Sequence, residues 1–101
     1  MDAELKRRIT SNRFGDALME YRIDHDAFRD YCECLDRLAL AWKGQLMVDK
    51  EVVLHVYATA SIIRNTVIQF QQKKLRAEAS ELEDMFIELD RRVVEECLRV
   101  D

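Results

Sequence analysis

Residues 51–72 read EVVLHVYATASIIRNTVIQFQQ, and this is the longest stretch of the chain with almost no charge. Between Glu51 and Lys73 the only formally charged residue is Arg64. An amphipathic surface helix carries a polar face about half its circumference wide, whereas apolar side chains here fall nearly all round. We therefore expect a central helix over about 50–75 that other helices enclose. Arg64 near its middle argues against a membrane span, which needs about 18 apolar residues.

The composition around this stretch favours an all-α fold. The chain has 101 residues, of which 49% are hydrophobic and 36% charged, and it contains two glycines and no proline. Because β-turns depend on glycine and proline, a fold built from hairpins is disfavoured. High charge together with high apolar content is typical of helices that are solvated on one side and packed on the other. The length predicts a single domain over 1–101.

Local signals predict where the helices begin and end. Asp2, Asp49 and either Asp24 or Asp26 are expected N-caps, and Gly44 suits the left-handed residue that follows a helix. The first segment either ends at residues 10–12, whose side chains compete for backbone hydrogen bonds, or bends and continues. We therefore expect a compact bundle of four main helices, at 2–22, 24–43, 50–75 and 78–100.

The break between the last two helices is the least defined. Basic residues around Arg76 followed by acidic ones favour a break near Arg76 to Ser80, and Ser80 with Glu83 matches a capping box. No glycine or proline marks that break. The structural alternative is one continuous helix about 75 Å long at 1.5 Å per residue, which would force a dimer.

A heptad pattern runs through the last segment. Its positions step by four and three, which is typical of a seam between packed helices. The one polar member is Glu96, and the adjacent Cys97 could replace it in the buried stripe. The seam comprises Leu75, Ala79, Leu82, Phe86, Leu89, Val93, Glu96 and Val100.

Further apolar residues of this segment lie outside the seam and predict a second neighbour. That neighbour could be another copy of the chain, so we expect a two-fold homodimer. The residues are Met85, Ile87, Val94 and Leu98. Arg64, Tyr57 and Trp42 are the other expected partner contacts, because arginine and aromatic residues are enriched at interface hot spots.

Two histidine positions raise the question of chemistry. Asp24, His25 and Asp26 are adjacent and point in different directions on a regular element, so a helix cap is favoured over a metal site. His55 lacks the spacing to a second ligand that metal-binding helices show. A hydrogen-bonded histidine in the core or at its rim is therefore favoured over a general base.

The cysteines predict packing. Cys32 and Cys34 lie two residues apart, so on a helix they point about 200° away from each other and cannot bind one metal together. We expect Cys32 on the apolar face and Cys34 in contact with solvent. An odd number of cysteines, three with Cys97, argues against a disulfide scaffold and favours a reducing compartment. Charged residues near the N-terminus break any signal-peptide pattern, so we expect a cytoplasmic protein.

Two charged clusters support alternative functions. An acidic row of Glu78, Glu81, Asp84 and Glu88 could hold magnesium in a small helical nucleotide hydrolase, if it faced the bundle interior. A basic cluster of Lys6, Arg7, Arg8 and Arg13 could contact nucleic-acid phosphates, although the net charge of −4 disfavours this.

No catalytic motif is present, and no family is recognised from the residues. We expect no cofactor, no metal and no catalytic residue. The sequence is best interpreted as a small non-catalytic intracellular regulator or adaptor, or an inhibitor or chaperone-like factor, which contacts another protein through helices and self-associates. The hydrolase and the nucleic-acid-binding regulator are the alternatives.

Overall fold

The computed structural model describes residues 1–100, and within them the chain is helical, as expected. The predicted first helix is split into two pieces. Asp101 lies outside the described residues. The elements are α1 (Ala3–Thr10), α2 (Phe14–Met19), α3 (His25–Trp42), α4 (Lys50–Gln72), α5 (Arg76–Arg91) and a π-helical turn η1 (Arg92–Cys97) that continues α5.

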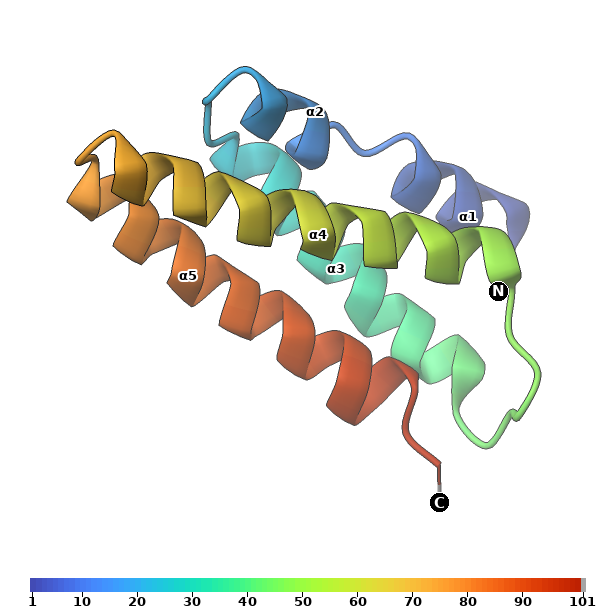
Figure 1. The fold of residues 1–101 in the computed structure, drawn as a ribbon. Coiled ribbons are helices and arrows are strands. Elements are labelled where there is room, and N and C mark those ends of the chain that lie inside the picture. Colours follow the sequence, from blue (N-terminus) through green and yellow to red (C-terminus); the bar gives the residue numbers. More distant parts are fainter. Residues whose placement is uncertain (101) are drawn as a thin grey trace.

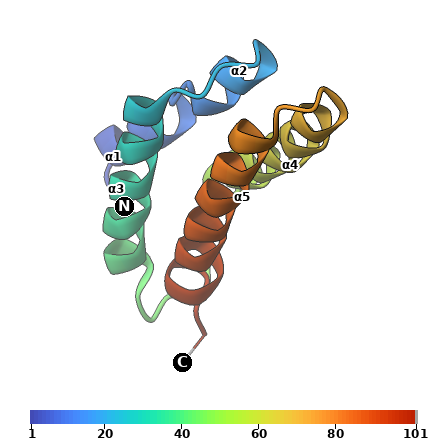
Figure 2. The ribbon, with the colours of Figure 1, turned by 90° about the vertical axis from the view of Figure 1, so that its left-hand side faces the viewer.

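The helices form an elongated bundle measuring 43 × 26 × 19 Å. Helices α4 and α5 run antiparallel as a hairpin (Figure 1). Helix α3 packs against α2 at its start, against α1 further along, and against η1 along its second half. Figure 2 shows the α4–α5 hairpin on one side of the molecule and α3 with α1 and α2 on the other. The bundle therefore places the C-terminal half of α5 close to the end of α3.

The predicted helix caps are confirmed. Asp2, Asp24 and Asp49 each accept a hydrogen bond from a backbone N–H in the first turn of α1, α3 and α4, at 2.7, 3.0 and 2.9 Å. Gly44 follows α3 with φ of +75°, in the left-handed region that glycine adopts without steric cost. Short polar side chains at these positions satisfy N–H groups that a helix leaves unpaired.

The predicted break near Arg76 to Ser80 exists but lies a few residues earlier, because residues 73–75 separate α4 from α5 and Ser80, the expected start of a capping box, lies inside α5. The turn is a Schellman motif: Leu75 N–H donates to the Phe70 carbonyl at 2.8 Å, and Lys74 N–H donates to the Gln71 carbonyl at 3.0 Å. Lys74 takes the left-handed conformation, with φ of +63°. This turn also excludes the single long helix.

A single core joins all the elements. Helix α3 contributes Tyr31, Leu35 and Leu38, and each of these side chains is almost fully buried. Burying a side chain of this size stabilises the fold by roughly 1.5–3 kcal/mol. Other fully buried members are Ile9, Phe14, Leu18, Val52, Ile63, Phe70, Leu82 and Leu89.

The π-helical turn decides which residue of the C-terminal segment enters the core. A π-turn holds one more residue than an α-turn, so Cys97 is buried in place of Glu96, as the sequence suggested. Its thiol donates to the Leu35 carbonyl at 3.3 Å. The predicted seam was wrong at its two ends, Leu75 and Val100, which are both exposed. Leu75 belongs to the Schellman turn before α5, and Val100 follows the end of η1, so neither residue lies on the helix.

Met85 was expected on the surface and is instead buried in the core. Its neighbour Phe86, expected in the seam, is only half-buried. Met85 belongs to the core cluster, whereas Phe86 packs against that cluster and lines a hollow with Val67 and Ile68 of α4. The last helix therefore presents less apolar surface than its sequence indicated.

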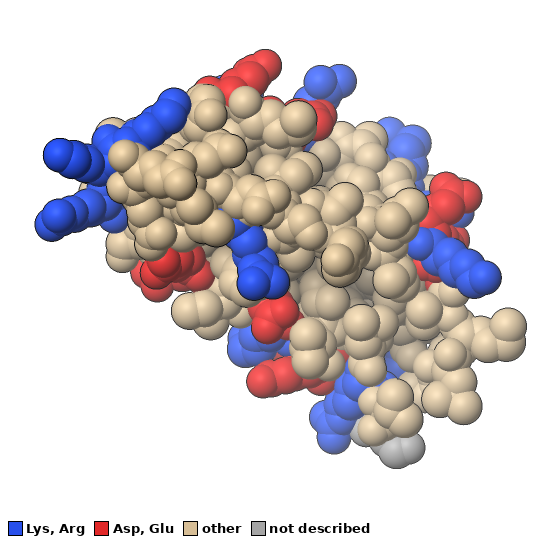
Figure 3. Space-filling view, viewed as in Figure 1, with Lys and Arg blue, Asp and Glu red and all other residues tan. Residues whose placement is uncertain are grey.

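Helix α4 is not enclosed on every side, so this prediction was wrong as well. Its buried residues form one stripe, which faces α1, α2 and α5. On the opposite face Leu54, Tyr57 and Ile68 are 67%, 71% and 52% exposed. Figure 3 shows few charged side chains over this part of the surface. Three packing neighbours cover only part of a helix that is apolar nearly all round.

Candidate protein-interaction surface

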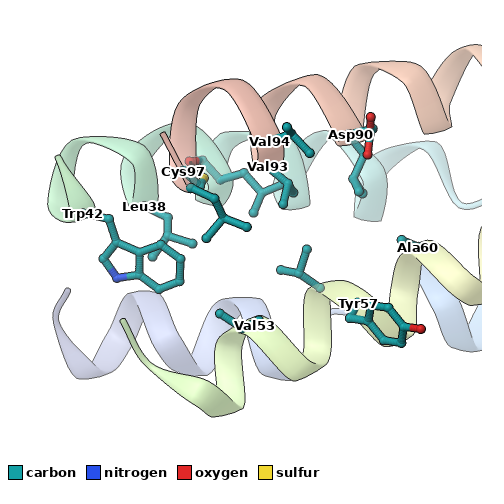
Figure 4. Close-up of a pocket in the computed structure, with 13 residues that line it drawn as sticks. Leu38, Trp42, Val53, Tyr57, Ala60, Asp90, Val93, Val94 and Cys97 are labelled. Atoms are coloured by element: carbon teal, nitrogen blue, oxygen red, sulfur yellow. Dashed lines mark hydrogen bonds between the residues drawn. The ribbon is translucent and has the colours of Figure 1, made fainter. Parts of the chain in front are cut away.

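An open apolar groove of about 230 Å³ lies between α4 and the C-terminal part of α5 with η1 (Figure 4). Helix α4 forms one wall, η1 forms the other, and the second half of α3 forms the floor. We call this feature the groove. Its lining residues are Leu35, Leu38, Trp42, Val53, Val56, Tyr57, Ala60, Leu89, Asp90, Val93, Val94, Cys97 and Leu98.

The mouth of the groove is formed by side chains that remain in contact with solvent. Tyr57 stands on the α4 wall, and Val94 and Leu98 stand on the opposite wall, all three exposed. Ala60, a small residue on α4, lies across the groove from Asp90 (Figure 4). Small residues beside large ones leave room for a side chain from another molecule.

Trp42 lies at one end of the groove, at the end of α3 (Figure 4). Only 6% of its surface is exposed, so it lines the groove and does not project as a contact residue. It is the only tryptophan of the chain. Its fluorescence will therefore report directly on what enters the groove.

Asp90 is the only formally charged residue that lines the groove. It lies on α5 at the end away from Trp42 (Figure 4). A carboxylate at the edge of an apolar groove favours a ligand that places a positive charge beside its apolar groups.

Exposed apolar residues continue beyond the groove. The loop after α3 carries Leu46 and Met47, which are almost fully exposed. With Leu54 they line a shallow hollow that shares Val53 and Tyr57 with the groove. Large exposed apolar side chains in a loop are an unusual sequence signal for a contact surface.

The wall on η1 owes its shape to the π-helical geometry. Val93, Val94 and Cys97 all belong to η1, and Cys97 lies at the point where the groove meets the core. Single π-turns within α-helices are uncommon and are frequently found at functional sites.

Arg64 lies outside the groove. It is exposed on α4, beside a second hollow formed with Ile68, Phe86 and Ile87. It forms no ion pair with any residue between 1 and 100. Of the six predicted contact residues, the groove therefore brings together Tyr57, Trp42, Val94 and Leu98, whereas Arg64 lies further along α4 and Met85 lies in the core.

The histidines have structural partners. Nδ1 of His55 lies 2.9 Å from the Tyr31 hydroxyl, which supports the interpretation as a hydrogen-bonded histidine at the rim of the core. Burial lowers the pKa of His55, and the Asp16 carboxylate only partly offsets that effect. His25 pairs with Glu81 across the α3–α5 contact, while Asp24 caps α3.

The expected exposure of Cys34 was wrong, because this side chain is fully buried. Helix α1 packs on that face of α3, where Arg8 forms an ion pair with Asp30. Cys32 is also buried, and all three cysteines are free thiols. Burial raises the pKa of each thiol, to about 12 for Cys97. These thiols therefore behave as packing groups.

The acidic row does not converge on the bundle interior. Glu78, Glu81, Asp84 and Glu88 are all exposed, and Glu88 forms an ion pair with Arg92 at 2.8 Å. Within residues 1–100 no group of three or more metal-binding side chains is placed to hold an ion.

Half of the basic N-terminal cluster has partners within the protein. Lys6 Nζ lies 2.9 Å from Asp49, and this contact raises the pKa of Lys6. Arg8 forms an ion pair with Asp30. Cations engaged in this way are less available to phosphates than free ones.

Among the described residues, no helix combines the length and the apolar character that crossing a bilayer requires. Comparisons of the chain with protein-family models, with curated proteins and with solved structures found no match.

Proposed function

We propose that this protein is a small non-catalytic intracellular regulator or adaptor that binds a helix of a partner protein in the groove. The observation that carries this proposal is the open apolar groove with Tyr57, Val94 and Leu98 exposed at its mouth. Contiguous apolar surface is uncommon on soluble monomers and marks interaction sites. An amphipathic helix laid into an apolar groove is a recurring mode of recognition.

The chemistry of the groove defines its occupant. Its lining is apolar except for Asp90, so the partner helix should present two or three large apolar residues at a helical spacing. One lysine or arginine should lie beside them, opposite Asp90. The net charge of −4 further favours a basic partner, mainly by increasing the rate of encounter.

Other features support the same proposal over its alternatives. Three free, buried thiols suit a reducing compartment. The outward acidic row disfavours a magnesium-dependent hydrolase, because its carboxylates face solvent and do not meet acids from a second helix. The ion pairs of Lys6 and Arg8 weaken the case for nucleic-acid binding.

The test compares capture by three forms of the protein. Wild type, Val94→Asp and Leu40→Asp would each be used to capture proteins from a native cell extract. Val94 is exposed at the groove mouth, and Leu40 is exposed on α3 outside the groove lining, so both substitutions place a charge on the surface without disturbing the core. A partner in the groove will be retained by wild type and Leu40→Asp and lost by Val94→Asp.

A second step identifies the contact directly. The captured partner, once purified, should change the fluorescence of Trp42 on titration, because the indole lines the groove. The proposal would be overturned if Val94→Asp captured the same proteins as wild type and the captured protein left the fluorescence of Trp42 unchanged.

A further inference from the structure

The outer face of α4 is uncovered, distinct from the groove and adjacent to it. It carries the large exposed apolar residues Leu54, Tyr57 and Ile68, together with the smaller Ala58, Ser61 and Asn65, on the side of α4 opposite the core. We call these residues the outer stripe. Tyr57 is the only one that also lines the groove.

We infer that the outer stripe is covered by the outer stripe of a second copy, with the two α4 helices crossing antiparallel about a two-fold axis at Ser61. This inference goes beyond the proposed function, because it concerns a second surface and does not depend on what fills the groove. The first argument is the sequence of α4. A helix that is apolar nearly all round calls for neighbours on every side, and α1, α2 and α5 leave this side open.

The second argument is the symmetry of the outer stripe. Ser61 lies seven residues from Leu54 and seven from Ile68. In an antiparallel pair centred on Ser61, Leu54 lies opposite Ile68 of the second copy, and the same contact repeats on the other side of the axis. Such a self-complementary arrangement is what a two-fold interface requires. The small Ala58 and Ser61 at the crossing allow the two helices to approach closely.

The third argument concerns Arg64. It is the only charged residue between Glu51 and Lys73 and forms no ion pair among residues 1–100. In the antiparallel arrangement it lies beside Tyr57 of the second copy, whose ring is 71% exposed in one copy. A guanidinium above an aromatic ring is a favourable contact. The second copy therefore supplies a partner for a cation that the single chain leaves in solvent.

Charge also selects the antiparallel direction. Lys73, Lys74 and Arg76 follow one another at the end of α4, and Figure 3 shows basic side chains projecting at the hairpin end of the molecule. A parallel pair would bring these two basic ends together, which is unfavourable. The antiparallel pair separates them by the length of α4.

The size of the contact bounds the strength of the dimer. Helix α4 has 23 residues and is therefore about 34 Å long. At a helix diameter of about 10–12 Å, a contact strip along it offers on the order of 400 Å² per copy. Stable interfaces of standard size bury about 800 Å² per partner. The outer stripe alone is therefore expected to support a weak dimer that forms at micromolar concentrations.

Sedimentation equilibrium on the full chain tests association. Wild type should approach twice its mass of 12.0 kDa at tens of micromolar. Ser61→Glu places two carboxylates at the axis and should weaken the dimer at least 100-fold, without touching the core. Leu40→Glu, at an exposed position on α3, is the matched control and should sediment as wild type. A wild-type monomer at all concentrations would overturn the inference.

Cysteine crosslinking tests the geometry, since the three native thiols are buried. Under mild oxidation Ser61→Cys should form a disulfide-linked dimer, because each new thiol faces its own copy across the axis. Leu54→Cys alone should not crosslink, whereas a mixture of Leu54→Cys and Ile68→Cys should. Rapid crosslinking of Leu54→Cys alone indicates a parallel pair and would overturn the inference.

The two surfaces can be told apart. Ser61→Glu leaves the groove lining unchanged and should still capture the partner protein, whereas Val94→Asp should still dimerise. A partner helix from another protein on the outer stripe, instead of a second copy, would leave wild type monomeric while Ser61→Glu lost a captured protein.

Discussion

The Tyr31 hydroxyl lies 2.9 Å from Nδ1 of His55, and the two rings stack with their centroids 5.7 Å apart. This contact joins the middle of α3 to the first half of α4. Tyr31 is fully buried and its burial raises the pKa of the hydroxyl, whereas burial lowers the pKa of His55. Both shifts favour the neutral forms, so the contact between the two helices depends on an uncharged imidazole.

A first prediction is that His55 makes stability depend on pH. Because its pKa is lowered in the folded protein, the unfolded chain binds the proton more readily once the pH falls below about 6.5. The contribution is complete above that pH and is lost as the pH falls further. We expect the free energy of unfolding, measured in urea, to fall between pH 7.5 and 5.5. The fall should be smaller in His55→Gln, and equal slopes in the two proteins would contradict the assignment.

The two glycines should respond to alanine with opposite signs. At Gly15 a new Cβ would lie 3.4 Å from Cδ1 of Ile62, an ordinary contact, so Gly15→Ala should stabilise the protein by about 0.5–1 kcal/mol. Gly44 has φ of +75°, so Gly44→Ala should destabilise it by about 1 kcal/mol although nothing lies within 4 Å. Thermal unfolding would show both effects, because each kcal/mol shifts the midpoint temperature by roughly 4–8 °C for a domain of this size.

Replacing Lys74 by glycine should increase the free energy of unfolding. Its φ of +63° places a side chain in the left-handed region, and Lys74→Gly should relieve about 1 kcal/mol. Tyr21, with φ of +57°, is the contrast. Its ring packs 6.3 Å from that of Phe70 and lies 3.7 Å from Lys73 Nζ, so Tyr21→Gly should bring no net gain. Urea unfolding of both variants measures the difference, and an equal gain in both would show that the Tyr21 contacts contribute little.

The sequence predicted features whose cause is local. Asp24 and Asp49 cap helices because a short polar side chain meets backbone N–H groups two or three residues away. The α4–α5 turn was misplaced because its left-handed residue is Lys74 and not glycine, while Ser80 and Glu83 imitate a helix start. Cys34 was misjudged because the helix that covers it, α1, is distant in sequence.

The candidate site was predictable only in part, because it depends both on residue type and on contacts between helices that are distant in sequence. Tyr57 was selected as an aromatic residue and Val94 as a surplus apolar residue, and both are exposed at the groove. Which apolar residues remain exposed depends on how the helices dock, so Met85 was wrongly placed on the surface. Asp90 and Ala60 carried no signal in the sequence, because their role arises only when α4 and α5 face each other.

Thiol labelling provides a direct check of the core. All three cysteines are buried, and burial raises the pKa of each thiol. We expect negligible reaction with a thiol reagent at pH 8 over minutes in the folded protein, and complete reaction in urea. Cys32, at 8% exposure, should react before Cys34 and Cys97 as denaturant is added. Rapid labelling of Cys34 without denaturant would contradict its packing under α1.

The π-helical turn has two consequences that a deletion can separate: it places Cys97 in the core and Val94 at the groove mouth. Glu95 is exposed within η1 and forms no ion pair among residues 1–100. Deleting it should convert η1 into a continuation of α5, because the chain loses the one residue that the π-turn holds in excess. Cys97 would then reach the same place in the core by regular α-helical spacing. The free energy of unfolding should therefore be unchanged or higher than that of wild type.

The groove should respond differently to the same deletion. Val94 stands on η1, so a change from π to α geometry turns its side chain away from the mouth. We expect the deletion variant to lose the captured partner and the change in Trp42 fluorescence while it remains as stable as wild type. Glu95→Ala, which keeps the chain length, is the control and should retain both. If the deletion instead lowers stability by more than about 1 kcal/mol, the π-turn is needed for packing, since a strained core commonly costs about 1–3 kcal/mol.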